Sequence, residues 1–146
     1  MKDILLGFLL LIVCASIHVT SMFGISEWLR RRWQRIQGPV GARAFSTLFG
    51  AGFGMIILLH LAEIFIWAIT YECLGLLNDF RTSFEFSLGT YTTNGTAGIQ
   101  LPSGWGVLGQ LESLAGLLLV GLSTAFLFLV IHKMFDVRRT ARETES

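Results

Sequence analysis

The chain has 146 residues, of which 53% are hydrophobic, and its mean hydropathy is +0.64. Long apolar runs with few charges indicate an integral membrane protein rather than an ordinary soluble domain. The 11 basic and 10 acidic residues nearly cancel, so the net charge says nothing about partners, and the length leaves no room for a separate soluble domain beside membrane spans.

The first predicted element is an apolar run without formal charge from Ile4 to Ile25. At about 20 residues it can cross a hydrocarbon core of about 30 Å. A cleaved signal peptide is the alternative, because Lys2 precedes the run and residues 14–16 (CAS) resemble a cleavage site. The run is longer than the apolar part of a signal peptide, so we expect a retained span. His18 is expected to be packed or to lie at the membrane interface.

An arginine-rich segment follows from Glu27 to Arg43, with Trp28 and Trp33 beside its five arginines. Arginine with neighbouring tryptophan is typical of a headgroup interface, where arginine meets phosphate and tryptophan straddles the boundary. We therefore expect contact with membrane lipids and no nucleic-acid partner. The pair Gly38-Pro39 should break any helix that continues through this segment.

The second predicted span, Phe45 to Ile69, contains His60 and Glu63, which share a helical face because they are three residues apart. A lone glutamate in hydrocarbon is costly, so Glu63 should be paired, protonated or facing protein. In a structural interpretation, which we favour, the two side chains tie this helix to a neighbouring helix. In a functional one they relay protons or bind a metal, although two ligands are too few for a metal site on one chain. Either way the pair could sense pH.

Between the spans, the segment from Asp79 to Pro102 starts like a helix and then becomes rich in Thr, Gly and Asn. The last span, Trp105 to Ile131, carries Glu112 near its start, and at Gly116 and Gly121 the helix could bend or pack closely. Within this span Ser123 and Thr124 could face a wet cavity or bond back to the preceding turn. A mixed-charge tail should begin as helix and fray.

The two cysteines, Cys14 and Cys73, match no metal-binding or redox spacing. We expect both to be buried thiols, since free cysteine behaves as a small apolar residue. A disulfide between subunits at Cys73 is the weaker alternative.

The basic residues also predict an orientation. The positive-inside rule places the arginine loop and the basic tail in the cytoplasm, so the N-terminus is periplasmic and the segment Asp79–Pro102 enters the membrane from outside. We expect an integral protein of a bacterial inner membrane.

The residues from Phe84 to Thr93, FEFSLGTYTT, resemble the pore helix and filter entry of the potassium-channel superfamily, which run F-S-x-x-T-x-T-T-x-G-Y-G-D. The matching positions are Ser87, Thr90, Thr92, Thr93 and Gly95. Further features are similar to bacterial two-span channels: His60 and Glu63 before Trp67, Leu74-Gly75 before Asp79-Phe80, Leu101-Pro102 before Trp105, and residues 119–128 (LVGLSTAFLF).

The resemblance covers roughly residues 45–135 and implies an all-α membrane protein with a pore-loop channel fold. Three transmembrane helices would carry a re-entrant pore helix and filter loop between the second and third, and four identical chains would enclose the pore. The implied parts are an N-terminal span with a basic loop, an outer helix, a pore helix, a filter, an inner helix and a tail, at residues 1–44, 45–72, 79–91, 92–98, 105–133 and 136–146.

The filter departs from the family pattern, because T-x-G-Y-G-D becomes Thr93-Asn94-Gly95-Thr96-Ala97-Gly98. Ala97 stands where the second glycine belongs, and a left-handed alanine costs about 1–2 kcal/mol. Thr96 replaces the filter tyrosine, and Gly98 replaces the aspartate at the mouth. We therefore expect a wider, wetter and weakly selective filter. An inner site for K⁺ or Na⁺ remains at Thr93, and the resemblance assigns filter support to His60, Glu63, Glu85 and Thr90.

The leading prediction is thus a passive homotetrameric cation channel, with no enzymatic activity, no cofactor and no small-molecule substrate. A non-conducting structural or regulatory relative with a collapsed filter is the alternative. A third hypothesis is a membrane enzyme or metal transporter, which would require His60, Glu63 and Glu112 to converge on a cavity with further ligands.

Overall fold

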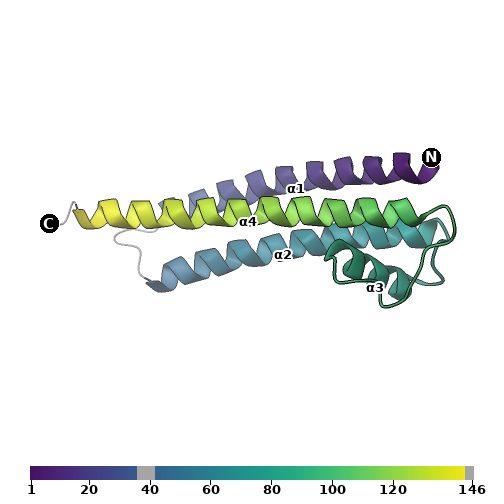
Figure 1. The fold of residues 1–146 in the computed structure, drawn as a ribbon. Helices are drawn as coiled ribbons and strands as arrows, with labels where there is room; N and C mark the ends of the chain where they lie inside the picture. Colours follow the sequence, from purple (N-terminus) through teal and green to yellow (C-terminus); the bar gives the residue numbers. More distant parts are fainter. Residues whose placement is uncertain (36–41, 144–146) are drawn as a thin grey trace.

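The computed structural model describes residues 1–35 and 42–143, with side chains for 1–35 and 43–133. The described residues form four α-helices and no strand: α1 (Lys2–Gln34), α2 (Ala42–Cys73), α3 (Phe80–Tyr91) and α4 (Gly106–Glu143). Figure 1 shows α1, α2 and α4 running beside one another as a long bundle, with the short α3 at the end that carries the N-terminus.

Three of these helices are long and apolar enough to cross a membrane, over Lys2–Gln34, Arg43–Cys73 and Gly106–Lys133. Large apolar side chains stay exposed along them, including Leu5, Phe23 and Phe128 at 70%, 74% and 67%. Such a surface is unfavourable in water and suits lipid tails, and helices satisfy their own backbone hydrogen bonds there. The chain therefore fits an integral membrane protein.

The first helix is longer than the span predicted at Ile4–Ile25, because α1 continues through the arginine-rich segment to Gln34. Local side-chain contacts suit this extension: Glu27 pairs with Arg30 and Arg31, three and four residues ahead, at 2.7 Å. The predicted break at Gly38-Pro39 lies outside the described residues. At the other end of the chain, α4 also continues, into the segment predicted as a tail.

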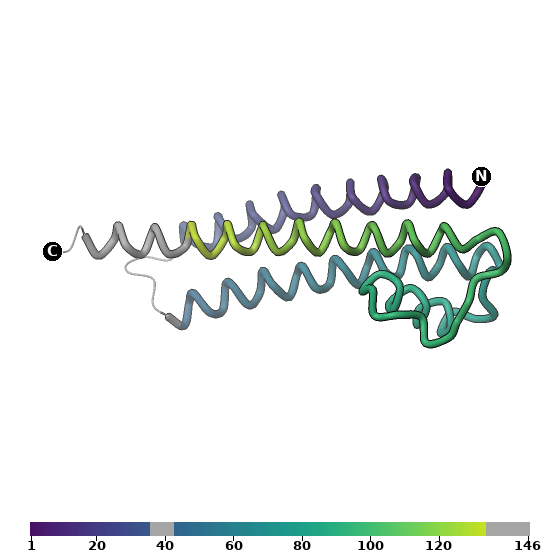
Figure 2. Tube along the Cα trace, viewed as in Figure 1, coloured from purple at the N-terminus to yellow at the C-terminus, as the bar shows by residue number. Residues whose placement is uncertain are grey.

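The short helix predicted at residues 79–91 is observed as α3, which begins after Asp79. The Asp79 side chain accepts hydrogen bonds from the Thr82 backbone N–H at 2.9 Å and from the Thr82 hydroxyl at 2.8 Å. A carboxylate at this position satisfies helix donors that otherwise lack partners. Figure 2 shows the chain after α3 returning to the end of the bundle where α4 starts.

The core lies where α3 packs between α2 and α4. Tyr71 of α2 meets Phe86 of α3 edge-on, with ring centroids 5.0 Å apart. The other buried members of this cluster are Cys14, Ile64, Trp67, Leu76, Tyr91, Leu108, Ala115 and Leu119. The expectation of two buried thiols is correct for Cys14 and wrong for Cys73, which is exposed at the end of α2.

Candidate functional site: the loop after α3 and a buried histidine–glutamate cluster

The backbone of the loop that follows α3 adopts left-handed angles at four residues. Thr93, Gly95 and Ala97 have φ values of 57°, 96° and 51°, and Gly98 follows at 83°. Alanine and threonine therefore occupy a region that only glycine enters without steric cost. Ala97 takes the angle that its place in the predicted filter demands.

This loop folds back tightly on the end of α3. The Asn94 backbone N–H donates to the Gly89 carbonyl at 2.9 Å. A Cβ atom added at Gly89 would lie 2.1 Å from the Gly95 carbonyl oxygen, so the loop approaches the helix closely enough to require glycine there. Within residues 92–98 Thr96 is half-buried and the others are exposed.

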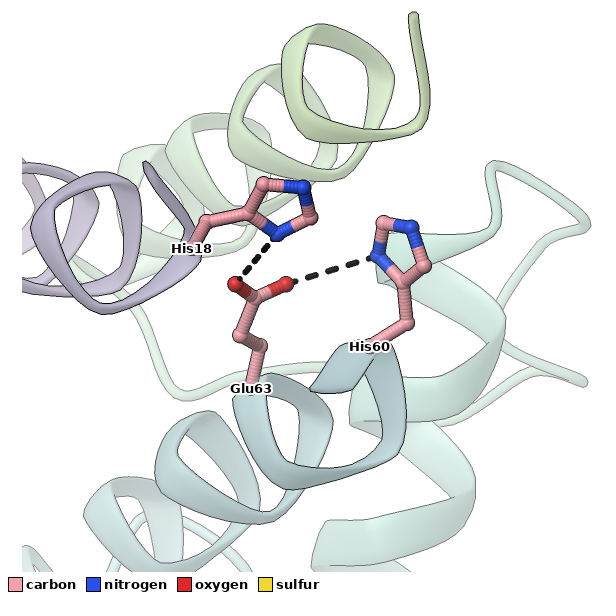
Figure 3. A group of neighbouring side chains, drawn as sticks. All are labelled: His18, His60 and Glu63. Atoms are coloured by element: carbon pink, nitrogen blue, oxygen red, sulfur yellow. Dashed lines mark hydrogen bonds and ion pairs between the residues drawn. The ribbon is translucent and has the colours of Figure 1, made fainter. Parts of the chain in front are cut away.

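A buried polar cluster lies directly behind the loop and joins all four helices. His18 of α1, His60 and Glu63 of α2 form its centre, and Figure 3 shows both imidazole rings directing one nitrogen at the Glu63 carboxylate. The His18 Nδ1–Oε1 distance is 2.8 Å and the His60 Nδ1–Oε2 distance is 3.4 Å. Tyr91 of α3 donates its hydroxyl to Glu63 Oε2 at 2.5 Å.

Ser123 of α4 completes this cluster on the opposite side of the two rings. Its hydroxyl oxygen lies 2.9 Å from His18 Nε2 and 3.0 Å from His60 Nε2. With the 2.9 Å contact between His60 Nδ1 and the Tyr91 hydroxyl, the contacts form a closed ring of five groups. His18 and Glu63 are fully buried, whereas the His60 side chain is 16% exposed.

The ring requires one more hydrogen than its neutral imidazoles and hydroxyls supply. Five contacts need five hydrogens, and two neutral imidazoles, Tyr91 and Ser123 supply four of them. The fifth must be carried by Glu63 or by one imidazole, so the metal-free ring is neutral overall. A buried polar ring without missing partners stabilises the arrangement of the four helices.

A second buried network surrounds Glu112, separately from the histidines. Its carboxylate accepts the hydroxyls of Ser87 and, at 2.6 Å, of Tyr71. Ser87 also contacts the Ile64 carbonyl at 2.9 Å, so this network joins α2, α3 and α4. Glu112 therefore has partners of its own and does not join His60 and Glu63, as the third hypothesis requires. The residue that joins them is His18.

The remaining predicted site residues lie in different surroundings. Glu85 is exposed and pairs with Arg81 at 3.1 Å, so within one chain it gives the loop no support. Thr90 is buried, and its carbonyl accepts the Ser113 hydroxyl at 2.9 Å. Thr124 bonds back to the Val120 carbonyl at 2.9 Å, whereas Ser123 joins the histidine ring.

The two predicted hinge glycines differ sharply. A Cβ at Gly116 would lie 2.1 Å from the Tyr91 carbonyl oxygen, so this position is a close contact between α4 and the end of α3. Gly121 is exposed, with nothing within 4 Å of an added Cβ. The helix is continuous through both.

Sequence reasoning did not assign His18 to the cluster, because 45 residues separate it from Glu63. The one available signal was the presence of an ionisable side chain in an otherwise uncharged span, which calls for a partner. His60 and Glu63 were recognised as a pair because they lie on one helix.

The class that this fold defines is an all-helical protein with three helices long and apolar enough to span a membrane. Comparison with known proteins found no matching family model, no similar curated protein and no similar solved structure.

Proposed function

We propose that this chain is the subunit of a homotetrameric, potassium-channel-like pore that conducts monovalent cations with weak selectivity. The observation that carries the proposal is the loop of residues 92–98, with left-handed φ angles at Thr93, Gly95 and Ala97. The potassium-channel pattern that this segment resembles places left-handed residues in its filter, and here Thr93 and Ala97 adopt such angles although neither is glycine.

The exposed surface of the chain supports an assembly of several copies. One loop cannot enclose a pore, and the loop residues are largely uncovered in the single chain. Along α4 an exposed stripe recurs every seven residues, a spacing that suits a face packed against other helices or lining a cavity. It consists of Val107, Leu114, Gly121 and Phe128.

The cluster behind the loop supports a filter held at its base. Tyr91 directly precedes the loop, and its hydroxyl contacts Glu63 and His60. The Tyr91 carbonyl oxygen lies against Gly116 of α4. Such contacts would hold the base of an inner cation site at Thr93 in position. Above it, Thr96 and Ala97 lack the bulk and the glycine freedom of a potassium-selective filter, so hydrated Na⁺ should pass nearly as well as K⁺.

The proposed orientation follows from the ends of the bundle. Figure 1 shows the N-terminus and α3 at one end and the C-terminal part of α4 at the other. Arg30, Arg31 and Arg32 lie in the last turns of α1, at the end away from the N-terminus. The positive-inside rule places that end in the cytoplasm and α3 on the periplasmic side of a bacterial inner membrane, where α3 would be re-entrant.

The direct test is flux through liposomes that contain the purified protein, with K⁺, Na⁺, Ca²⁺ and Cl⁻ measured separately and empty vesicles as the control. We expect K⁺ and Na⁺ to pass at similar rates and Cl⁻ to be excluded. A companion variant, Thr96→Tyr with Ala97→Gly and Gly98→Asp, should increase the preference for K⁺. Strong K⁺ selectivity of the unaltered chain would contradict the weak-filter proposal, and no cation flux at all would favour the non-conducting alternative.

A further inference from the structure

We propose that His18, His60 and Glu63 bind one divalent transition-metal ion per chain, with Zn²⁺ the best match to the donor atoms. The candidate ligand atoms of the three residues all lie within 4.8 Å of one another. Two imidazole nitrogens and a carboxylate oxygen form a donor set that Zn²⁺ takes readily. K⁺, Na⁺ and Ca²⁺ prefer oxygen alone, so this site is distinct from the proposed cation site in the pore, and its test does not depend on ion conduction.

The separations of the donor atoms suit a tetrahedral ion. Bonds of about 2.0–2.1 Å place tetrahedral ligands roughly 3.3 Å apart. His18 Nδ1 lies 2.8 Å from Glu63 Oε1, His60 Nδ1 lies 3.4 Å from Glu63 Oε2, and the donor atoms of the three residues are at most 4.8 Å apart. The Tyr91 hydroxyl, 2.9 Å from His60 Nδ1, can supply the fourth oxygen while it keeps its hydrogen and donates it to the carboxylate. The side chains therefore need only small shifts to surround an ion.

Ser123 provides the outer contacts that such a site requires. An imidazole bound to metal through Nδ1 carries its hydrogen on Nε2, and that N–H is held by a fixed acceptor in most metal sites. Both Nε2 atoms face the Ser123 hydroxyl, at 2.9 and 3.0 Å. A hydroxyl oxygen has two lone pairs and can accept both hydrogens, so Ser123 can hold both rings in the tautomer that leaves Nδ1 free for the metal, once its own hydroxyl hydrogen turns away from the rings.

Binding can be written with protons and charge in balance. The metal-free ring holds five hydrogens and is neutral. With the ion bound, both Nδ1 atoms coordinate it and four hydrogens remain, two on Nε2 atoms, one on Tyr91 and one on Ser123. One proton is therefore released for each M²⁺ bound, and the site changes from neutral to a net charge of one positive unit. The partly exposed His60 gives the ion a route to the cluster.

The test uses the full chain, purified in detergent without a histidine tag and treated with a chelator. After addition of Zn²⁺ and removal of the excess, elemental analysis should find one ion per chain, and an indicator dye should report one proton released per ion. Co²⁺ should give the visible absorption of a tetrahedral site with nitrogen and oxygen ligands. Ser123→Ala removes an outer contact and should lower the Zn²⁺ affinity by about 10–100-fold. His60→Gln and Glu63→Gln each remove a ligand and should lower the affinity by more than about 100-fold.

His132→Gln is the matched control, because it removes the third histidine of the chain from an exposed position next to Phe128. It should leave binding unchanged. If the cluster variants fail to fold, the unaltered chain still decides the matter through a Zn²⁺-dependent rise in melting temperature. The proposal is overturned if Zn²⁺ neither stays bound nor raises that temperature, if His132→Gln abolishes binding, or if the Co²⁺ spectrum shows thiolate ligands.

Discussion

Gly89 and Gly116 lie where a backbone carbonyl approaches a helix so closely that no side chain fits. At both positions an added Cβ would stand 2.1 Å from a carbonyl oxygen, that of Gly95 or that of Tyr91. The two contacts place the end of α3 against its own loop and against α4. Small residues here act through their size, since α4 remains a regular helix at Gly116.

Gly116→Ala should therefore destabilise the protein, because the Tyr91 backbone must move to make room for the new methyl group. We expect a loss of about 1–3 kcal/mol, the usual cost of overpacking. Thermal unfolding in detergent measures the effect. Gly121→Ala is the control: it meets nothing within 4 Å, and alanine favours a helix, so stability should be unchanged or slightly higher. An equal loss in both variants would rule out the contact with Tyr91 as the cause.

Sequence signals within one helix predict where α3 begins but not how far α1 and α4 extend. The start of α3 agrees with the prediction that the segment from Asp79 begins as a helix, and in the structure Asp79 is an N-cap whose hydrogen bonds involve only the next few residues. Both α1 and α4 continue past the predicted spans, since loss of hydropathy ends a membrane span but need not end a helix. In the part of α1 beyond the predicted span, Glu27 pairs with Arg30 and Arg31, three and four residues ahead.

The cap at Asp79 predicts a defined pH dependence. Its hydrogen bond with the Thr82 backbone N–H lowers the pKa of the Asp79 carboxyl from its ordinary value of 3.8. The charged form is thus favoured in the folded state, so its contribution to stability is present above pH 3.8 and is lost as the pH falls through the lowered pKa.

Melting temperatures measured between neutral and strongly acidic pH test this cap. Asp79→Ala should lower the melting temperature at neutral pH and remove part of the decline at acidic pH. Asp79→Asn should keep most of the stability at neutral pH, because asparagine also caps helices, but lose the same part of the pH dependence. Identical acid profiles for the aspartate and asparagine proteins would show that Asp79 is not the titrating group.

Among the described side chains, two buried polar networks join the helices. The ring through Glu63 includes side chains from all four helices, and the network around Glu112 connects α2, α3 and α4. Buried polar groups are favourable only when their partners are all present. Together the networks hold α3 in place, at the end of the bundle where the loop lies.

Replacement of Glu112 tests the second network. Glu112→Leu should leave the Tyr71 hydroxyl buried without an acceptor, at a cost of about 1–3 kcal/mol, whereas the Ser87 hydroxyl keeps the Ile64 carbonyl as its acceptor. Glu112→Gln keeps an oxygen acceptor and should be milder. Both are compared by thermal unfolding, alone and with Tyr71→Phe. When Tyr71 is already replaced by phenylalanine, Glu112→Leu should cost less stability than in the unaltered chain. An equal loss of stability with and without Tyr71→Phe would show that the Tyr71 contact contributes nothing.

The sequence by itself determined the three apolar helices, the short helix after Asp79 and the pairing of His60 with Glu63, because each depends on hydropathy or on residues within one turn. It did not determine that His18 turns inward, that Glu112 binds Ser87 and Tyr71, or that Gly116 meets a carbonyl. These contacts link helices distant in the chain, and hydropathy does not specify the rotation of one helix against another. Only the packed bundle brings the five groups of the ring together, since each needs a partner from a different helix or turn to be buried at low cost.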